Sequence, residues 1–380
     1  MLFVVEARSA STVAAVRSVL DDGPFRLVEV PDALPHTKPK ALNFALPLCR
    51  GEFVVVYDAE DTPHPEQLWR AIDRFRTRPE LQCVQAQLLI DNGGKGLLPA
   101  LFAGEYAGLF TVLLPALARW RLPVPLGGTS NHFRIETLRR IGGWDAYNVT
   151  EDADLGVRLA RLRLPVETMI CPTLEEAPTA LPVWMGQRSR WMKGWTQTLI
   201  VHNRAPLRLA REAGWLPALA FQIWAFGTIL APLAHTGFLL TLLVQVLIGA
   251  PVLQGGWSWT TVYLLILVYG YGTAIAMVAV GLRRRGALHL LPAQLLLPLY
   301  WLLTGSLVAF LVVIGGLALA SIGGGYQTLG AAADAKAYPM PGQLIDVGGH
   351  RLHLSCTGAG TLKRPSISGR AAASARLAAR

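Results

Sequence analysis

The first half of the chain alternates between short apolar runs and stretches whose apolar residues have helical spacing. Four runs have strand length and are apolar or β-branched, at 2–5, 25–30, 53–57 and 83–90. The helix-like stretches fall at 11–20, 40–49, 65–76 and 152–163. This alternation predicts an α/β fold whose sheet is parallel in the main. Such sheets carry their chemistry at the carboxyl ends of the strands.

The second half is apolar and almost free of charge. Between residues 214 and 333 the charged side chains are Arg283, Arg284 and Arg285. Residues 215–248 as one helix would be about 51 Å long, which exceeds a hydrocarbon core of about 30 Å. We therefore predict a break at Pro232, with an interfacial or re-entrant segment at 215–231. Membrane spans are expected near 233–250, 260–282 and 293–322.

Basic residues flank these apolar segments. Arg204, Arg208 and Arg211 precede the first expected span, and residues 283–285 follow the second. Because cytoplasmic loops are enriched in Lys and Arg, both clusters are expected in the cytoplasm. The expected organisation is a catalytic-type domain over 1–200, a juxtamembrane segment over 201–214, membrane helices over 215–325 and a polar tail over 326–380.

Composition narrows the class of protein. The chain is 52% hydrophobic and 16% charged, with a mean hydropathy of +0.38, whereas soluble proteins have roughly a quarter charged residues. Its formal net charge of +10 arises beside the apolar segments and in the tail, so we expect no nucleic-acid partner. The four cysteines lack zinc-site or disulfide-framework spacing.

Three short motifs carry candidate chemistry. Asp58 and Glu60 follow an apolar run, and on an extended chain they share a face that could hold Mg²⁺ or Mn²⁺; the alternative is a solvated turn. Thr150-Glu151-Asp152 opens a helix-like stretch. There Thr150 suits an N-cap and the acids suit the helix dipole, while a carboxylate could also act as a general base.

The third motif precedes the apolar half. Gln187, Arg190 and Trp191 are spaced to share one helix face. An arginine can bind a phosphate with two hydrogen bonds, and an indole can stack on a sugar ring. The alternative is a juxtamembrane helix with snorkelling arginines and interfacial tryptophans.

In their order, these motifs resemble the signature of the membrane-bound family 2 glycosyltransferases, the cellulose-synthase-like group. Further matches lie between them at 36–43, 127–134 and 142–145. The resemblance runs from about Leu2 to Trp301. It implies an α/β fold of GT-A type, which is a Rossmann-like nucleotide-sugar transferase domain, followed by transmembrane helices.

The resemblance also implies residue roles. Asp58 and Glu60 become the metal-binding pair, and Asp152 becomes the base that deprotonates the acceptor hydroxyl. The expected nucleotide-sugar contacts are Glu6, Lys38, Asp58 and Arg190. The expected acceptor contacts are Gly128, Thr129, Gln187 and Trp191.

The implied reaction is inverting transfer of a sugar from a UDP-sugar, with Mg²⁺ or Mn²⁺, to a polysaccharide or lipid-linked acceptor. The sequence leaves a single transfer and processive synthesis open, and the motif of Gln187, Arg190 and Trp191 favours processive synthesis. The implied location is the inner (plasma) membrane, among its lipids, with the catalytic domain in the cytoplasm.

Two departures from the family leave alternatives open. The chain begins at the family's second strand, so we expect an incomplete GT-A sheet with an exposed edge. Residues 338–360 instead resemble the opening hairpin of an α/β-hydrolase, as a fusion or frameshift scar would. A catalytically inactive remnant or a non-catalytic membrane subunit is therefore the second hypothesis. A glycoside hydrolase ranks below both, because two acids on one strand end are poorly placed for it.

Overall fold

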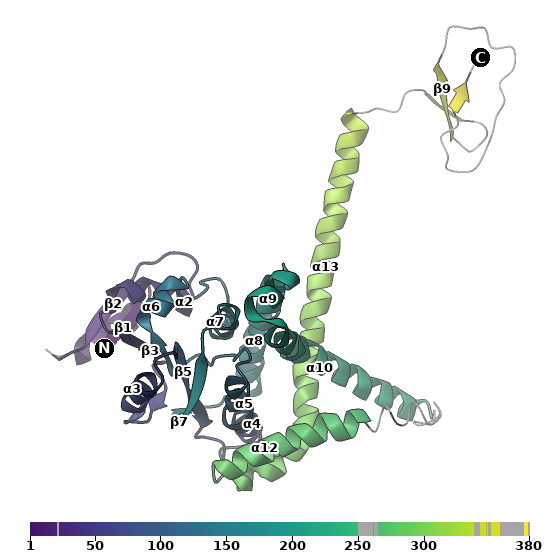
Figure 1. Ribbon diagram of the computed structural model, residues 1–380. Coiled ribbons are helices and arrows are strands. Elements are labelled where there is room, and N and C mark those ends of the chain that lie inside the picture. Colours follow the sequence, from purple (N-terminus) through teal and green to yellow (C-terminus); the bar gives the residue numbers. More distant parts are fainter. Residues whose placement is uncertain are drawn as a thin grey trace. The chain divides into compact units, whose positions relative to one another are not determined.

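Figure 1 shows the computed structural model of the chain, which describes residues 1–20, 23–249, 261, 265–337, 343–346, 348, 351–357 and 376–378. The chain divides into two compact units, Met1–Phe310 and Leu311–Arg380. The first unit contains two sheets, the helices packed on them, and apolar helices that continue the chain.

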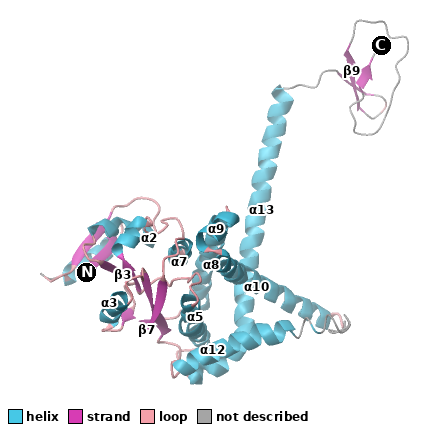
Figure 2. Cartoon of the chain, viewed as in Figure 1, coloured by secondary structure: helices cyan, strands magenta, loops and turns pink. Residues whose placement is uncertain are grey.

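Two sheets form the α/β part of the first unit (Figure 2). Its strands are β1 Leu2–Glu6, β2 Arg26–Val30, β3 Phe53–Val56, β4 Thr62–Pro63, β5 Cys83–Ile90, β6 Asn131–Arg134 and β7 Val166–Glu175. Strands β1 and β2 pair in parallel as a two-stranded sheet, and the five others have the order β3-β6-β5-β7-β4. Strand β3 is therefore an edge of the larger sheet, hydrogen-bonded to β6 alone.

The α/β class and the four predicted strands are confirmed, but the prediction of a mainly parallel sheet is wrong. Strands β5 and β7 are parallel, whereas β6 is antiparallel to both β3 and β5, and β4 is antiparallel to β7. The difference arises at β6, whose sequence Asn-His-Phe-Arg has too few apolar residues to show a strand pattern. Inserted between β3 and β5, it makes the sheet mixed.

Helices connect the strands and cover the sheet. In the α/β part they are α1 Ala10–Val19, α2 Lys38–Ala45, η1 Leu46–Leu48, α3 Gln67–Thr77, α4 Leu97–Gly108, η2 Leu109–Leu113, α5 Leu114–Arg119, α6 Ile135–Arg140 and α7 Glu151–Arg161. They continue as α8 Leu181–Asn203, α9 Pro206–Ala213, α10 Trp215–Leu247, η3 Ile266–Tyr271, α12 Gly272–Arg284, η4 Leu288–Leu296 and α13 Leu297–Ala337. The four predicted helices correspond to α1, α2 with η1, α3 and α7.

Apolar side chains fill both faces of the larger sheet. Phe75 of α3 packs with Val84 of β5 and Met169 of β7 in one buried cluster. Phe102 of α4 and Leu114 of α5 belong to a second, larger cluster. Strand β5 contributes to both clusters because successive side chains of a strand point to opposite faces. The pairing register of β5 with β7 shifts between Ala86 and Leu88, as at a β-bulge.

The apolar stretch at 97–119 is a helical segment that the sequence pattern did not reveal. It runs through α4, η2 and α5, and it is long and apolar enough to cross a membrane, yet 67% of its most apolar window is buried within the protein. Gly281 of α12 lies so close to the backbone of Ala107 that a Cβ would overlap it. The segment is therefore a packing core for α12 and η4.

Two further helical segments of the described chain are long and apolar enough to cross a membrane, Trp215–Leu247 and Leu288–Gly305. The predicted break at Pro232 is wrong, because α10 continues through that residue. Gly305 packs against the Pro232 carbonyl and the Thr236 side chain so closely that a Cβ would not fit. Contacts with a neighbouring helix can support a helix through a proline.

The structure describes part of the span predicted at 260–282 and the arginine cluster that follows it. The span predicted at 260–282 includes residues outside the described ones, and its described part is η3 and α12. Arg285, expected as an orientation signal, is part-buried and donates to the Leu88 carbonyl at 2.9 Å and to the Thr111 hydroxyl at 2.7 Å. Arg285 therefore also ties the end of α12 to β5 and η2.

In the second unit, α13 continues from the first unit and strands β8 Gln343–Asp346 and β9 Arg351–Thr357 pair antiparallel. A third strand, β10 Arg376–Ala378, pairs parallel to β9. The β8–β9 pair lies within residues 338–360. Most of the tail after residue 357 lies outside the described residues.

An asparagine ties α2 to the loop that leads to α7. The Asn43 side chain donates to the Trp144 carbonyl at 2.7 Å and accepts from the Trp144 backbone N–H at 2.9 Å. Gly143, at φ 67°, lies against the Asn43 amide where no Cβ would fit. Two of the matching motifs thus have a structural role, since they hold α2 against the loop that leads to α7.

We predict that Asn43→Ala lowers the free energy of unfolding by about 1–3 kcal/mol, because it leaves both Trp144 backbone groups without their partner. Asn43→Asp keeps the acceptor and loses the donor, so its loss should be smaller. Denaturant titration of the detergent-solubilised chain measures both. Equal stability of Asn43→Ala and the parent would contradict this function of Asn43.

Candidate active site

Side chains from three segments converge on Gly128. A Cβ built at this glycine would lie 3.4 Å from Asp152 Oδ2, 3.8 Å from Asp58 Oδ2 and 3.8 Å from Lys38 Nζ. Lys38 begins α2, Asp58 follows β3, and Asp152 lies in the first turn of α7. The structure thus brings together four of the residues predicted to act in the site. A side chain at position 128 would occupy the space between the two carboxylates and the ammonium.

Lys38 is the centre of this arrangement. Its ammonium forms an ion pair with Asp58 and donates a hydrogen bond to the Gly128 carbonyl at 2.6 Å. The buried Thr129 accepts a hydrogen bond from the Asp58 backbone N–H at 3.2 Å. The next residue, Ser130, is buried in the left-handed region at φ 60°. Such strain is typical of functional sites.

The spacing of Asp58 and Glu60 predicted that both lie on an extended strand. The structure places them on a turn instead. Strand β3 ends at Val56, and the Asp61 backbone N–H bonds back to the Asp58 carbonyl at 3.2 Å, which closes a turn. Glu60 is exposed on this turn. Within the part of the chain that the structure describes, no three His, Cys, Asp or Glu side chains are grouped closely enough to hold a metal ion.

The same region nevertheless has the donor chemistry that a hard cation needs. Asp61 Oδ2 and Glu175 Oε2 are buried carboxylate oxygens without a hydrogen-bond partner among the described residues. Burial, together with Asp58 and Glu60, raises the pKa of Asp61 to about 6. Burial and the charges of Asp61, Asp58 and Glu60 raise the pKa of Glu175 to about 8. Excess negative charge and orphaned oxygen ligands fit Mg²⁺ or Mn²⁺.

Glu175 was missed by the sequence analysis. It is the last residue of β7, which is not a clear apolar run, and the exposed Glu176 follows it. The signal that could have found it is its place at the carboxyl end of a strand. Because β5 and β7 are parallel neighbours, that end lies at the edge of the sheet where chemistry is expected.

Asp152 is held at the start of α7. Burial and the neighbouring Glu151 raise its pKa, and Lys38 acts in the opposite direction. Thr150 occupies the N-cap position as predicted but makes no side-chain cap. Its hydroxyl instead donates to Asn148 Oδ1 at 3.3 Å. A carboxyl with a raised pKa beside an ammonium is suited to accept a proton near neutral pH.

A buried polar layer fixes α7 against α8. The Asn148 amide donates to the Thr198 hydroxyl at 2.9 Å, and His202 Nε2 lies 2.9 Å from Asp154 Oδ1. Gly194 allows α8 to approach the Thr150 side chain, since a Cβ there would overlap it. These contacts span the first turn of α7, so they set the position from which Asp152 projects.

The motif at 187–191 lies on α8 as predicted, but its members have different surroundings. Arg190 is exposed and makes no hydrogen bond or ion pair with the described residues. Trp191 packs against Phe102, with ring centroids 6.0 Å apart. Gln187 is part-buried, and its Oε1 has no partner among the described residues.

Arg188, which the sequence analysis did not single out, is the buried arginine of this helix. It binds both carboxylate oxygens of Glu105, at 2.7 and 2.5 Å, and the Tyr300 hydroxyl at 2.7 Å. Its guanidinium lies 4.7 Å from the Trp191 ring centroid. Trp191 is therefore part of a packed cation–π cluster that joins α8 to α4 and α13.

Glu6 lies apart from the convergence at Gly128. It ends β1 and forms an ion pair with Lys40 at 2.9 Å. The Lys40 ammonium also donates to the Ala33 carbonyl at 2.9 Å. Glu6 and Lys38 are thus linked through α2, since Lys40 follows Lys38 by two residues.

The geometry can be compared with known proteins. A model of the family described as Glycosyl transferase family group 2 matches residues 53–323. The chain belongs to this family. Membership and the mixed sheet confirm the α/β, GT-A-type fold that the sequence predicted. The matched range includes Asp58, Gly128, Asp152 and the motif at 187–191.

Individual relatives of this family 2 chain are distant. It is 28% identical over 184 residues to a beta-monoglucosyldiacylglycerol synthase of Trichormus variabilis, which covers 45% of this chain and 38% of that one. It is 27% identical over 144 residues to a probable glucomannan 4-beta-mannosyltransferase of Arabidopsis thaliana, covering 38% and 26%. The chain thus aligns with less than half the length of these relatives.

The solved structures that resemble this chain are also distant from it in sequence. A mannosyltransferase from Pyrobaculum calidifontis in complex with GDP-Man and Mn²⁺ is 20% identical with a TM-score of 0.47, over 78% of this chain and 76% of that one. Glucosyl-3-phosphoglycerate synthase from Mycobacterium tuberculosis is 19% identical with a TM-score of 0.34, over 51% and 67%.

The raised pKa of Glu175 predicts a pH dependence of stability. A carboxyl that titrates at about 8 when folded and at 4.5 when unfolded retains its proton better in the folded state. Its stabilising contribution is therefore complete below 4.5 and is lost as the pH rises through about 8. We expect Glu175→Gln, in EDTA, to reduce this fall in unfolding free energy, as measured by denaturant titration across that pH range.

The control is Glu176→Gln, which removes an exposed carboxylate paired with Lys95 at 3.3 Å. It should keep the pH slope of the parent. Identical slopes for Glu175→Gln and the parent would contradict the placement of Glu175 in a buried acidic cluster.

Proposed function

We propose that the chain is a membrane-attached glycosyltransferase that transfers a sugar from a UDP-sugar to a lipid-linked or polysaccharide acceptor with inversion. The observation that carries this proposal is the convergence of Lys38, Asp58 and Asp152 around Gly128. Family membership supports sugar transfer as the reaction class. The relatives include a beta-monoglucosyldiacylglycerol synthase and a probable glucomannan 4-beta-mannosyltransferase, and these names support the two acceptor classes.

In this proposal Asp152 is the base. Inverting transfer needs one group that accepts the proton of the acceptor hydroxyl as the oxygen attacks the anomeric carbon. Asp152 has a raised pKa and lies on the Gly128 side of the site, so its carboxylate can take that proton. Gly128 leaves room for the sugar between Asp152 and the groups that hold the donor.

The donor diphosphate is proposed to lie on the Asp58 side. Lys38 offers an ammonium there, and Asp58 with Glu60 would hold Mg²⁺ or Mn²⁺, with Asp61 and Glu175 close by. A bound cation supplies charge neutralisation for the departing diphosphate. Arg190, exposed and without an ion pair among the described residues, is free to contact the diphosphate. Gln187, Trp191 and Thr129 are proposed to border the acceptor, and Glu6 the nucleotide base.

Membrane attachment is proposed to occur through α10 and the apolar helices that follow it. The most apolar window of α10 is only 6% buried, and no charged residue lies within the helix. A surface of this composition and length is suited to lipid. The catalytic part would then lie in the cytoplasm, where UDP-sugars are available, at the inner (plasma) membrane.

The decisive variant is Asp152→Asn. We expect it to lower the turnover number by about 10²–10⁴-fold, because the amide cannot accept the acceptor proton, while donor binding persists. The measurement is UDP release from UDP-sugars by purified membranes with Mn²⁺. Asp73→Asn removes an exposed carboxylate on α3 and is the control, expected to match the parent. Turnover of Asp152→Asn within a few-fold of the parent would contradict the role of Asp152.

A further inference from the structure

An eight-residue sequence occurs twice in the chain. Residues 117–124 read Leu-Ala-Arg-Trp-Arg-Leu-Pro-Val, and residues 159–166 read Leu-Ala-Arg-Leu-Arg-Leu-Pro-Val. The copies differ only where Trp120 is replaced by Leu162. The first copy ends α5 and the second ends α7.

Both copies end their helix with the same backbone geometry. The second arginine of each, Arg121 and Arg163, has a φ of 54°. The N–H of Arg121 bonds to the Ala118 carbonyl at 3.1 Å, and the N–H of Arg163 bonds to the Ala160 carbonyl at 3.0 Å. This is a Schellman-type helix end, whose left-handed position usually belongs to glycine. An arginine is less favourable than glycine at this backbone conformation, so we expect a role for its side chain.

The second copy shows what its arginines bind. Arg161 forms an ion pair with the Glu212 carboxylate at 2.5 Å and also contacts His202 Nδ1 at 3.0 Å. Arg163 donates to the backbone carbonyls of Glu212 at 2.8 Å and Arg211 at 3.2 Å. Both guanidinium groups thus bind oxygen acceptors supplied by the end of α9.

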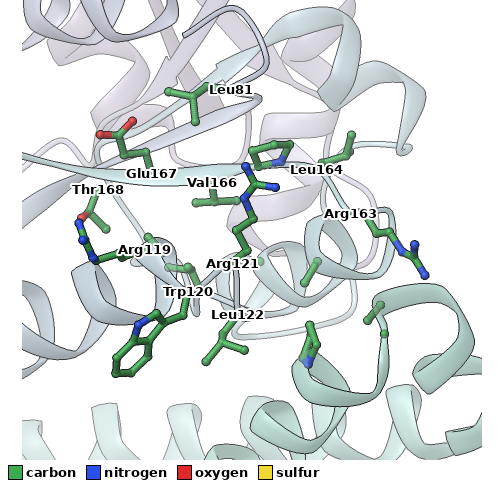
Figure 3. Close-up of a pocket in the computed structure, with 18 of the residues that line it drawn as sticks. Leu81, Arg119, Trp120, Arg121, Leu122, Arg163, Leu164, Val166, Glu167 and Thr168 are labelled. Atoms are coloured by element: carbon green, nitrogen blue, oxygen red, sulfur yellow. The ribbon is translucent and has the colours of Figure 1, made fainter.

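The first copy has no such acceptors. Neither Arg119 nor Arg121 makes a side-chain hydrogen bond or ion pair with any residue that the structure describes, and both are exposed. Figure 3 shows these two side chains extending from one turn toward β7, while Trp120 between them points to the opposite side. Exposed guanidinium groups without an internal acceptor are suited to bind an oxyanion.

The two copies line one cavity of about 1210 Å³ (Figure 3). Its charged lining is Arg78, Arg119, Arg121, Arg163, Glu80 and Glu167. Glu167 is already shared by Arg74 and Arg78, each at 3.2 Å. Positive charge is therefore in excess, and it is greatest at Arg119 and Arg121. The cavity is complementary to an anion.

The lining continues onto the first residues of α10, including Trp215 and Leu216. Trp215 is 73% exposed and Trp120 is 68% exposed. Tryptophan is enriched where protein meets the boundary between lipid and water. An anion bound there would be at the level of lipid headgroups if α10 enters the membrane.

The cavity is separate from the candidate active site. The lining of the cavity on α7 begins at Gly156, one turn after Asp152, which is roughly 6 Å at the rise of an α-helix. The lining includes none of Lys38, Asp58, Gly128 and Asp152, so a lipid bound there is distinct from the groups proposed to react.

We infer that Arg119 and Arg121 bind the phosphate of an anionic phospholipid in this cavity, where the membrane helix α10 begins. The inference rests on the proposed membrane attachment and assigns to the protein a lipid site distinct from the reacting groups. In the second copy, Arg161 binds the carboxylate of Glu212. The lipid phosphate takes the corresponding place beside the arginines of the first copy. The exposed tryptophans lie beside the acyl chains.

The test is calorimetric titration of the full chain, purified in a non-ionic detergent, with three probes. Dihexanoylphosphatidylglycerol should bind saturably. Dihexanoylphosphatidylcholine, which carries a compensating positive charge, and inorganic phosphate, which has no acyl chains, should each bind at least about tenfold more weakly. The double variant Arg119→Gln/Arg121→Gln should lose at least about tenfold in affinity for the phosphatidylglycerol.

Two further variants separate binding from folding. Arg76→Gln/Arg140→Gln removes the same charge from exposed arginines outside the cavity, and it should bind as the parent does. Arg121→Gly places the preferred residue at the left-handed position, so its unfolding temperature should not fall while lipid affinity does. Loss of binding in Arg121→Gly then reflects the missing guanidinium.

Unchanged affinity in Arg119→Gln/Arg121→Gln would overturn the inference, as would equal affinity for the two lipids. Inorganic phosphate binding as tightly as phosphatidylglycerol would overturn the assignment to a lipid. Flotation with phosphatidylcholine vesicles tests membrane attachment by itself. A chain that floats but shows no headgroup preference disproves the lipid site alone, and one that does not float with any vesicle disproves the attachment in the proposed function.

Discussion

The interaction on which the site depends is the attraction between one ammonium and a group of carboxylates. Lys38 pairs with Asp58, and its charge also lowers the pKa values of Asp61, Asp152 and Glu175 against the effect of burial. Without a positive charge, burying several acids together would be costly. The raised pKa values show that one ammonium compensates them only in part, so the site is suited to a second cation.

This electrostatic requirement explains several features of the surrounding fold. Asn43 fixes α2, and therefore Lys38, against the loop that leads to α7. The polar layer between α7 and α8 fixes the start of α7, and therefore Asp152. Gly128 and Ser130, which has a φ of 60°, lie in the loop that leads into β6, where the missing side chain of Gly128 leaves space between the charged groups. Packed helices thus hold Lys38 and Asp152 in place for the proposed reaction.

The sequence predicted the parts of this structure that depend on local pattern. Strand β5 was predicted at its observed bounds, because six of its eight residues are apolar. Asp58 was found because it follows a strand, and Asp152 was found because it lies in the first turn of a helix. The sheet's mixed direction was missed, because β6 is short and polar and its place is set by pairing with two distant strands.

Other residues of the site could not be predicted because their roles arise from packing. Glu175 becomes part of the acidic cluster only when β7 pairs beside β5. Arg188, and not Arg190, is buried on α8, because Glu105 from the unrecognised helix α4 provides its partner. The arginines at 119 and 121 differ from those at 161 and 163 in the same way. The two sequences differ at one position, and only the tertiary structure shows that Arg161 pairs with Glu212 whereas Arg119 and Arg121 pair with no described carboxylate.

The most direct test of the account is calorimetric titration of UDP, with Mn²⁺, into the detergent-solubilised chain and its Asp58→Ala variant. We predict Mn²⁺-dependent binding by the parent that is lost in Asp58→Ala and retained in Asp73→Ala, whose carboxylate is exposed on α3. Binding that is equal in the parent and Asp58→Ala, or no binding by the parent, would contradict the claim that the groups around Gly128 form a nucleotide-sugar site.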